Sequence, residues 1–237
     1  MSYIEGFVAA VPRANKDAYK KHAAEALPYF KKLGATRMVE NWGDDVPDGK
    51  VTDFKRSVKA NGDEDVIFSW VEYPDKATRD RANEAMRNDQ SMTESMNTMP
   101  FDGKRMIWGG FEPVNDSGKA ERPGYVDGCL IPVPTDRKSD YLEMADKHAA
   151  LLKEYGATRV VDAWGDDIPA GKITDYQGAV QARDGETVIF SWVEWPSKEA
   201  RDQGWDKAMK DPRMEAMKMP FDGQRMIYGG FATMLDA

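Results

Sequence analysis

Two copies of one seven-residue segment, VIFSWVE, each end in a carboxylate that could transfer protons. They occupy Val66–Glu72 and Val188–Glu194. Because alternate side chains of a strand share a face, Glu72 and Glu194 should each lie beside a phenylalanine and a tryptophan. A carboxylate among aromatic rings loses its hydration, which raises its pKa and suits general acid–base catalysis. Glu72 and Glu194 are therefore candidate catalytic residues.

The alternative for both glutamates is structural. Each ends its strand, so its carboxylate could reach water or form an ion pair with an arginine. The arginines available for such a pair are Arg79, Arg105, Arg201 and Arg225. Catalysis requires a water-accessible cavity beside Glu72 or Glu194, whereas ion pairs without a cavity favour a non-catalytic protein.

Arg105 and Arg225 are candidate ligand-binding residues. Each follows the tripeptide FDG in a second repeated segment, MPFDGxRMIxGGF. A guanidinium group can hold an anionic ligand through two parallel hydrogen bonds. The same group could instead pair with the nearby carboxylate of Asp102 or Asp222.

Aromatic side chains are expected to line a pocket between the sheet and the helices of each repeat. The candidates are Trp42, Trp70, Trp108, Trp164, Trp192 and Tyr228. Many of the fourteen methionines cluster within 86–106 and 209–226, and flexible thioethers suit a wall that adapts its shape. Filling of the core is the alternative for most of these residues.

The two histidines and the single cysteine favour structural roles. His22 corresponds to Met144 in the second repeat, so the two histidines do not occupy equivalent positions. A shared role as haem ligand or general base would require equivalent positions, which His22 and His148 lack. Cys129 corresponds to Phe7 and is expected to be a core thiol, and one cysteine excludes an intrachain disulfide.

Neither a metal nor a cofactor is predicted. The pairs Asp44–Asp45 and Asp166–Asp167, followed by Asp53 and Asp175, could bind a hard cation, but such carboxylates more often cap backbone amides in a turn. The chain has no Asp-x-Asp-x-Asp-Gly loop and no set of His and Cys ligands. It also lacks GxGxxG, GxxxxGK[ST], CxxC, GxSxG and HExxH, which leaves nucleotide-phosphate, zinc-hydrolase and serine-hydrolase chemistry without support.

Composition and net charge limit the kinds of molecule that the chain is expected to bind. The 237 residues carry a net charge of −8 without a basic run, which argues against nucleic acid. No apolar run approaches the ~18 residues of a membrane span, and the N-terminal segment has no basic region typical of a signal peptide. With its single cysteine, the chain is expected in the cytoplasm, with a small molecule as its partner.

The elements that must position these residues occur twice in the chain. The segment Met99–Phe111 returns at Met219–Phe231 with eleven of thirteen positions identical. The predicted organisation is a first repeat over 1–112, a linker over 113–124 and a second repeat over 125–237.

Each repeat predicts the ferredoxin-like order β-α-β-β-α-β, with a further short strand between its second and third strands, toward Ala60 or Ala182. Gly34 and Gly156 are expected to end the first helix of each repeat, and Asp75 and Ser197 to begin the second. The strand ending in VIFSWVE is apolar on both faces, so both faces should be covered. Helices can cover one face, and the sheet of the other repeat can cover the second.

Each repeat resembles the DUF1428 family of bacterial proteins. The resemblance rests on WGDDxPxGKxTD, on the ETVIFSWVE strand and on MPFDGxRMIxGGF, and it extends over nearly all of both repeats. It implies an α+β fold of the dimeric α+β barrel superfamily, with two ferredoxin-like repeats whose antiparallel sheets pack into one barrel within the chain. Further oligomerisation stays open.

Two hypotheses for function follow. Relatives by fold include cofactor-free monooxygenases, haem-degrading enzymes and lactone isomerases, which implies a small-molecule-binding protein with one pocket per repeat and cofactor-independent oxygenase- or isomerase-type chemistry. The alternative is a non-catalytic stress-response or interaction module whose motifs lock the two sheets together. A shared fold does not decide between them.

Overall fold

The protein is built from two successive sets of four strands. The structure, a computed structural model, describes residues 2–89 and 98–237. The first repeat contains β1 (Tyr3–Pro12), α1 (Lys16–Lys32), β2 (Arg37–Asp45), α2 (Phe54–Ser57), β3 (Glu64–Tyr73), α3 (Lys76–Asn88) and β4 (Ile107–Gly118). The second contains β5 (Tyr125–Pro134), α5 (Lys138–Glu154), β6 (Arg159–Asp167), α6 (Tyr176–Ala179), β7 (Glu186–Trp195), α7 (Lys198–Ala208), α8 (Pro212–Glu215) and β8 (Ile227–Asp236).

Local sequence signals set the ends of the main helices. Asp75 and Ser197 are the N-caps of α3 and α7, and each side chain accepts a hydrogen bond from the backbone N–H three residues further on. Gly34 and Gly156 follow α1 and α5 with φ angles of +100° and +108°, a conformation that favours glycine. Both predictions are confirmed.

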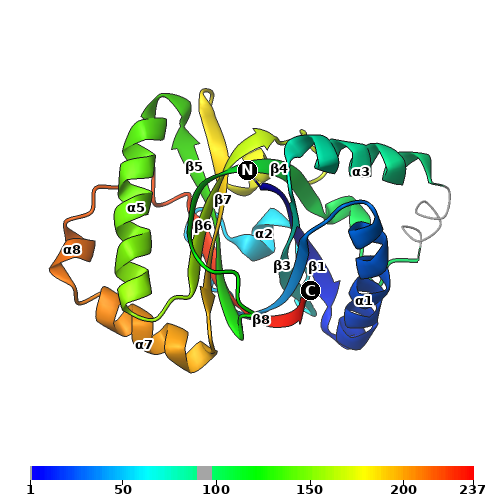
Figure 1. Cartoon of the computed structure of the whole chain (residues 1–237), viewed down its shortest axis with the longest axis horizontal. Helices are drawn as coiled ribbons and strands as arrows, with labels where there is room; N and C mark the ends of the chain where they lie inside the picture. The colour runs from blue at the N-terminus through cyan, green and yellow to red at the C-terminus, as the bar shows by residue number, and fades with distance from the viewer. Residues whose placement is uncertain (1, 90–97) are drawn as a thin grey trace.

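The eight strands form one closed antiparallel barrel in the order β1-β3-β2-β8-β5-β7-β6-β4. The last strand of each repeat crosses to the other, so β4 pairs with β6 and β8 with β2. Helices α1 and α3 lie on one side of the barrel and α5 and α7 on the other (Figure 1). The predicted α+β barrel of two ferredoxin-like repeats within one chain is confirmed.

The predicted linker, 113–124, is shorter in the structure. Its first six residues continue β4 as far as Gly118 and pair with β6, so that only 119–124 lie outside a strand. The reason is that β6 would otherwise expose an unpaired edge. The extension of β4 supplies its hydrogen-bonding partner.

Aromatic rings from the two repeats meet inside the barrel. Phe68 stacks on Phe190 with ring centroids 4.4 Å apart, and Trp70 stacks on Trp192 at the same separation. Gly128 in β5 faces the ring of Phe68, and a Cβ there would lie 2.9 Å from it. The glycine is needed because this ring, which belongs to the other repeat, occupies the space of a side chain.

The short strands predicted toward Ala60 and Ala182 are wrong, because Asp53 and Asp175 cap the short helices α2 and α6 there instead. These helices contribute to the same core at the end of the barrel where β3 and β7 begin. Phe54 of α2 packs edge-on against Phe231 at 5.4 Å, and Tyr176 of α6 packs against Phe111 at 5.0 Å. Thr52, just before α2, donates a hydrogen bond of 2.7 Å to the backbone oxygen of Ala179 in α6. The WGDDxPxGKxTD motif therefore contributes to closing this end of the barrel.

Gly128→Ala should lower the free energy of unfolding by about 1–3 kcal/mol, because the added methyl group overpacks the core against Phe68. Gly62→Ala is the matched control, since nothing lies within 4 Å of a Cβ at that position. Urea denaturation of both variants measures the difference. Equal stabilities would contradict the tight contact across the barrel.

Candidate functional site

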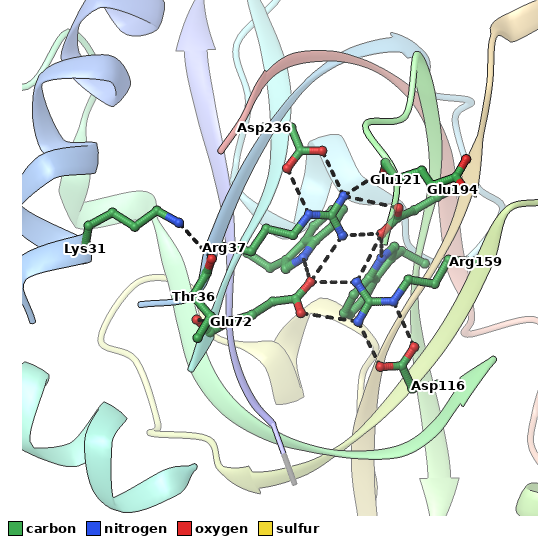
Figure 2. Close-up of polar contacts among 11 residues, drawn as sticks. Lys31, Thr36, Arg37, Glu72, Asp116, Glu121, Arg159, Glu194 and Asp236 are labelled. Carbon is green, nitrogen blue, oxygen red and sulfur yellow. Dashed lines mark hydrogen bonds and ion pairs between the residues drawn. The ribbon is translucent and has the colours of Figure 1, made fainter. Parts of the chain in front are cut away.

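Glu72 and Glu194 belong to a buried ring of charges where the two repeats meet. Arg37 contacts Glu194 at 2.8 Å and Glu72 at 3.3 Å, and Arg159 contacts the same two glutamates at 3.4 and 2.7 Å. The guanidinium groups lie side by side between the carboxylates (Figure 2). We call these four residues the charge ring.

Further groups satisfy the outer atoms of the charge ring. Asp236 accepts two hydrogen bonds of 2.9 Å from Arg37, and Asp116 accepts two of 2.8 Å from Arg159. The indole N–H groups of Trp70 and Trp192 donate to the glutamates of their own strands at 3.1 and 3.0 Å. The ring therefore stabilises the contact between repeats through charge-assisted hydrogen bonds.

Both predicted catalytic glutamates are held in ion pairs. Glu72 lies on the face shared with Trp70, as strand alternation predicts, and neither Glu72 nor Glu194 is among the lining residues of four cavities in the described part of the chain. Their partners are Arg37 and Arg159 rather than the four arginines considered from sequence. Each glutamate pairs with one arginine of its own repeat and one of the other repeat. The sequence of a single repeat does not show the second of these partners.

Arg105 and Arg225 also serve the fold. Arg105 contacts Glu64 at 2.6 Å and Asp102 at 3.0 Å, and Arg225 makes the equivalent contacts with Glu186 and Asp222. Their hydrogen bonds lower the pKa values of Glu64 and Glu186. The structural alternative, pairing with Asp102 and Asp222, is the arrangement observed.

The six predicted pocket aromatics do not form one wall. Trp70 and Trp192 point into the barrel, whereas Trp42 and Trp164 lie outside it, packed against tyrosines of α1 and α5. Trp108 is half-buried, and Tyr228 is exposed. Trp42 lies opposite Ile67 in β3 and Trp164 lies opposite Ile189 in β7. Each of these isoleucines is three positions from Trp70 or Trp192 on its strand, so strand alternation puts the two groups of tryptophans on opposite faces.

The acidic pairs of the WGDD motifs join the repeats. Asp44 contacts Lys198 at 2.5 Å and accepts a hydrogen bond from the hydroxyl of Tyr125, and Asp45 contacts Arg201. Asp166 and Asp167 make the equivalent contacts with the first repeat. Hydrogen bonding to Lys198 lowers the pKa of Asp44.

Asp53 and Asp175, by contrast, cap α2 and α6 as turn residues do. Among the described residues, no group of three or more His, Cys, Asp or Glu side chains is placed to hold a metal.

A cavity of about 300 Å³ lies between α1 and the outer face of the first repeat's strands. We call it the first-repeat cavity. Its apolar and aromatic lining consists of Phe7, Ala9, Tyr19, Ala23, Ala26, Tyr29, Phe30, Met38, Ile67, Val71, Met99, Phe101 and Met106. Its polar lining consists of His22, Glu25, Glu40 and Ser69.

Glu40 of β2 is the buried carboxyl group of this cavity, with 8% of the residue exposed. Tyr19 donates a hydrogen bond of 2.6 Å to its Oε2, and Ser69 donates to the same oxygen. Burial raises the pKa of Glu40 and lowers that of His22. No Lys or Arg among the described residues forms an ion pair with Glu40.

The second oxygen of Glu40 is available. Both hydroxyl groups reach Oε2, and no described residue donates to Oε1. Oε1 is not completely enclosed by protein atoms, so it reaches the open space of the cavity. Glu40 can therefore accept a hydrogen bond or a proton from a bound molecule.

At its buried end, the equivalent region of the second repeat is filled. Asp162 corresponds to Glu40, but its two oxygens accept from different donors, Tyr141 at 2.7 Å and Asn115 at 3.0 Å. His148 replaces Ala26, and the fully buried Leu152 replaces the half-buried Phe30.

The second repeat has a cavity of its own, of about 700 Å³, between α5 and residues 213–220. Its lining includes Met144, Lys147, Leu151 and Met219, the counterparts of His22, Glu25, Tyr29 and Met99. Neither Tyr141 nor Asp162 lines this cavity, so the second repeat offers no carboxyl group equivalent to Glu40 there.

Sequence reasoning missed Glu40 and Asp162. The signal was present, because the matching segments RMVENW and RVVDAW each carry a carboxylate on the strand face that also holds Trp42 or Trp164. A carboxylate on a face that packs beneath a helix is a candidate for a perturbed pKa. Cys129, in the filled region, packs among apolar neighbours as predicted, and burial raises its pKa.

Comparison with known proteins also finds two repeats in the chain. The family described as "Protein of unknown function (DUF1428)" matches residues 2–103 and again 124–223. The chain belongs to the DUF1428 family. YbaA of Escherichia coli K12 is 59% identical over 116 residues, which cover 49% of this DUF1428 chain and 99% of YbaA. One repeat thus corresponds to the whole of that relative.

Solved structures share the fold of this DUF1428 chain. A candidate monooxygenase from Fusobacterium nucleatum superposes with a TM-score of 0.58 at 9% identity, covering 99% of this chain and 93% of that one. An anthrone oxidase-like protein gives a TM-score of 0.57 at 10% identity, covering 100% and 92%. At these identities the likeness concerns the fold. No helix within 2–89 or 98–237 has the length and hydrophobicity to span a bilayer.

Arg37→Met should destabilise the protein by about 3–5 kcal/mol, because the two buried glutamates of the charge ring must then share Arg159 alone and Asp236 loses its arginine. Lys147→Met, which removes an exposed pair with Glu143, is the control and should cost no more than about 0.5 kcal/mol. Chemical denaturation measures both values. A small effect of Arg37→Met would show that the ring contributes little to stability.

Glu40→Gln should make stability less dependent on pH. Because burial raises the folded-state pKa of Glu40 above its usual value of 4.5, the folded chain binds a proton more strongly than the unfolded chain. Stability contributed by this group is therefore present below the unfolded pKa and lost as the pH rises through the folded pKa. The variant lacks this loss and should gain stability relative to wild type as the pH rises. Urea midpoints across that range test this, and parallel curves would contradict it.

Proposed function

We propose that the chain binds one small, mainly apolar molecule in the first-repeat cavity and that Glu40 accepts or transfers a proton there. The observation that carries the proposal is a buried carboxyl group without a cation, which presents one unpaired oxygen to a largely apolar cavity. Burial of a carboxyl group costs free energy unless its oxygens are hydrogen-bonded, and a donor on a ligand would supply the hydrogen bond that Oε1 lacks. Ligand pockets typically combine apolar walls with a few polar groups of this kind.

The size of the cavity supports a ligand of one or two rings. A volume of about 300 Å³ is at the lower end of the range for small-molecule sites. Three methionines, Met38, Met99 and Met106, contribute flexible side chains that can adjust to a ligand's shape.

Proton abstraction is the reaction class that suits Glu40. A carboxylate with a raised pKa is a stronger base than an exposed one and can remove a proton from an activated carbon or a hydroxyl group. Such a step can begin either an isomerisation or an oxygenation. The solved structures that share the fold include a candidate monooxygenase and an anthrone oxidase-like protein, which is consistent with this class.

The second repeat acts as a structural partner in this proposal. It completes the barrel and the charge ring, while its own cavity beside α5 is not lined by Asp162, whose two oxygens are both paired. The expected stoichiometry is one ligand per chain.

A non-catalytic module is the second candidate. It is favoured by the repeated motifs, because their charged residues form the charge ring, the contacts between repeats and the caps of α2 and α6. Under this alternative the first-repeat cavity has no ligand, and Glu40 is a buried group tolerated by the fold.

Ala26→His should abolish binding in the first-repeat cavity, because it introduces the side chain that the second repeat has at this position. The test is a titration with naphthalene, followed by calorimetry and thermal shift. A ligand present at about 100 times its Kd should stabilise the wild type by about 2.7 kcal/mol. The variant should show no such gain.

His148→Ala is the matched control and should leave the first site intact. A stoichiometry near one for wild type, lost in Ala26→His and kept in His148→Ala, supports the proposal. Naphthalene binding that is unaffected by Ala26→His would place the site elsewhere and contradict it. No binding of naphthalene or its derivatives would favour the non-catalytic module.

A further inference from the structure

The first-repeat cavity is lined by two carboxyl groups. Glu40 lies at its buried side, and Glu25 lines it from the exposed face of α1, where Lys21 lies 3.7 Å from its carboxylate. Among the described residues, the lining itself contains no Lys or Arg. His22 is the remaining titratable base there, and burial lowers its pKa, which favours the neutral ring. An anionic ligand would therefore lose its hydration without gaining a compensating cation.

The hydrogen-bond inventory beside Glu40 leaves an acceptor. The hydroxyl groups of Tyr19 and Ser69 are the donors nearest the carboxyl group, and both donate to Oε2. Oε1 is left with its lone pairs facing the cavity. A ligand gains most by presenting an O–H or N–H group, because a hydrogen bond to a carboxylate is stronger than one between neutral groups.

The surrounding rings favour a flat ligand. The centroid of the Phe101 ring lies 5.6 Å from that of Tyr19 and 6.4 Å from that of His22. Phe7 and Phe30 add aromatic surface to the same lining. Aromatic side chains pack against rings in stacked or edge-on geometries, so a ring can contact several of them while its polar substituent reaches Glu40.

From these three features we infer the ligand class: an uncharged or cationic aromatic molecule that carries a hydroxyl or amine donor, which bonds to Oε1 of Glu40. This inference rests on the proposed function and adds its selectivity. The cavity discriminates in favour of a donor and against a negative charge. Glu40 is the residue that determines both preferences.

The test compares naphthalene derivatives of nearly equal size at neutral pH. The set is 1-naphthol, 1-naphthylamine, 1-methoxynaphthalene and 1-naphthoate. At least one of the two donors should bind about 10-fold tighter than 1-methoxynaphthalene, which can only accept. 1-Naphthoate should bind about 100-fold more weakly than that donor, since it brings a second negative charge beside Glu40. The tighter of 1-naphthol and 1-naphthylamine assigns the hydroxyl or the amine as the group recognised.

Glu40→Gln should remove the preference. Its amide oxygen can accept from Tyr19 and Ser69, which places the NH₂ group where Oε1 lies in the wild type. The oxygens of 1-naphthol and 1-methoxynaphthalene can both accept from this NH₂ group, so the variant should bind these two compounds with nearly equal affinity, and it should gain affinity for 1-naphthoate. A general loss of packing would weaken all four compounds together. Asp162→Asn in the second repeat is the matched control and should keep the wild-type order.

Binding of all four compounds with equal affinity, or an unchanged order in Glu40→Gln, would overturn the selectivity while leaving the proposed site intact. Tight binding of 1-naphthoate to wild type would do the same. Failure of naphthalene and all four derivatives to bind would overturn the proposed function together with this inference.

Discussion

Each half of the barrel depends on charges supplied by the other. Arg37 and Arg159 both contact Glu72 and Glu194, so each arginine forms an ion pair across the boundary between repeats. Removing one repeat would leave buried charges without partners, which is far more costly than losing an exposed ion pair. The stacked rings of Phe68 and Phe190 follow the same pattern, and so does the pairing of β4 with β6 and of β8 with β2. The two repeats therefore form one cooperative unit.

The repeated motifs predicted the fold because they encode contacts that occur twice. The strand VIFSWVE carries Phe68 and Glu72 in one copy and Phe190 and Glu194 in the other, and all four meet their counterparts inside the barrel. These residues are identical in the two repeats because the two-fold arrangement requires them in both. This is also why Glu72 and Glu194 seemed catalytic in sequence, since strand alternation reveals the shared face but not the partner across the barrel.

The candidate site lies where the repeats differ. Whether a cavity exists beneath α1 or α5 depends on the summed volume of side chains such as Ala26 against His148, which hydrophobic periodicity does not measure. The inequivalent histidines argued against a shared function, and in the structure the two repeats have cavities with different linings, of which one reaches Glu40 and the other does not reach Asp162. Glu40 could have been found from its position on an apolar strand face. Its free oxygen could not, because that depends on where Asn115 and the two hydroxyl donors lie.

Fusion of the repeats has an evolutionary consequence. In a symmetric homodimer every substitution appears on both subunits. A change that improves a pocket or stabilises the structure in one subunit therefore also occurs in the other. The crossing of β4 and β8 keeps the same architecture within a single polypeptide, yet each half can mutate independently. Specialisation of one half for chemistry and the other for support becomes accessible by single substitutions, a route closed to a relative that consists of one repeat.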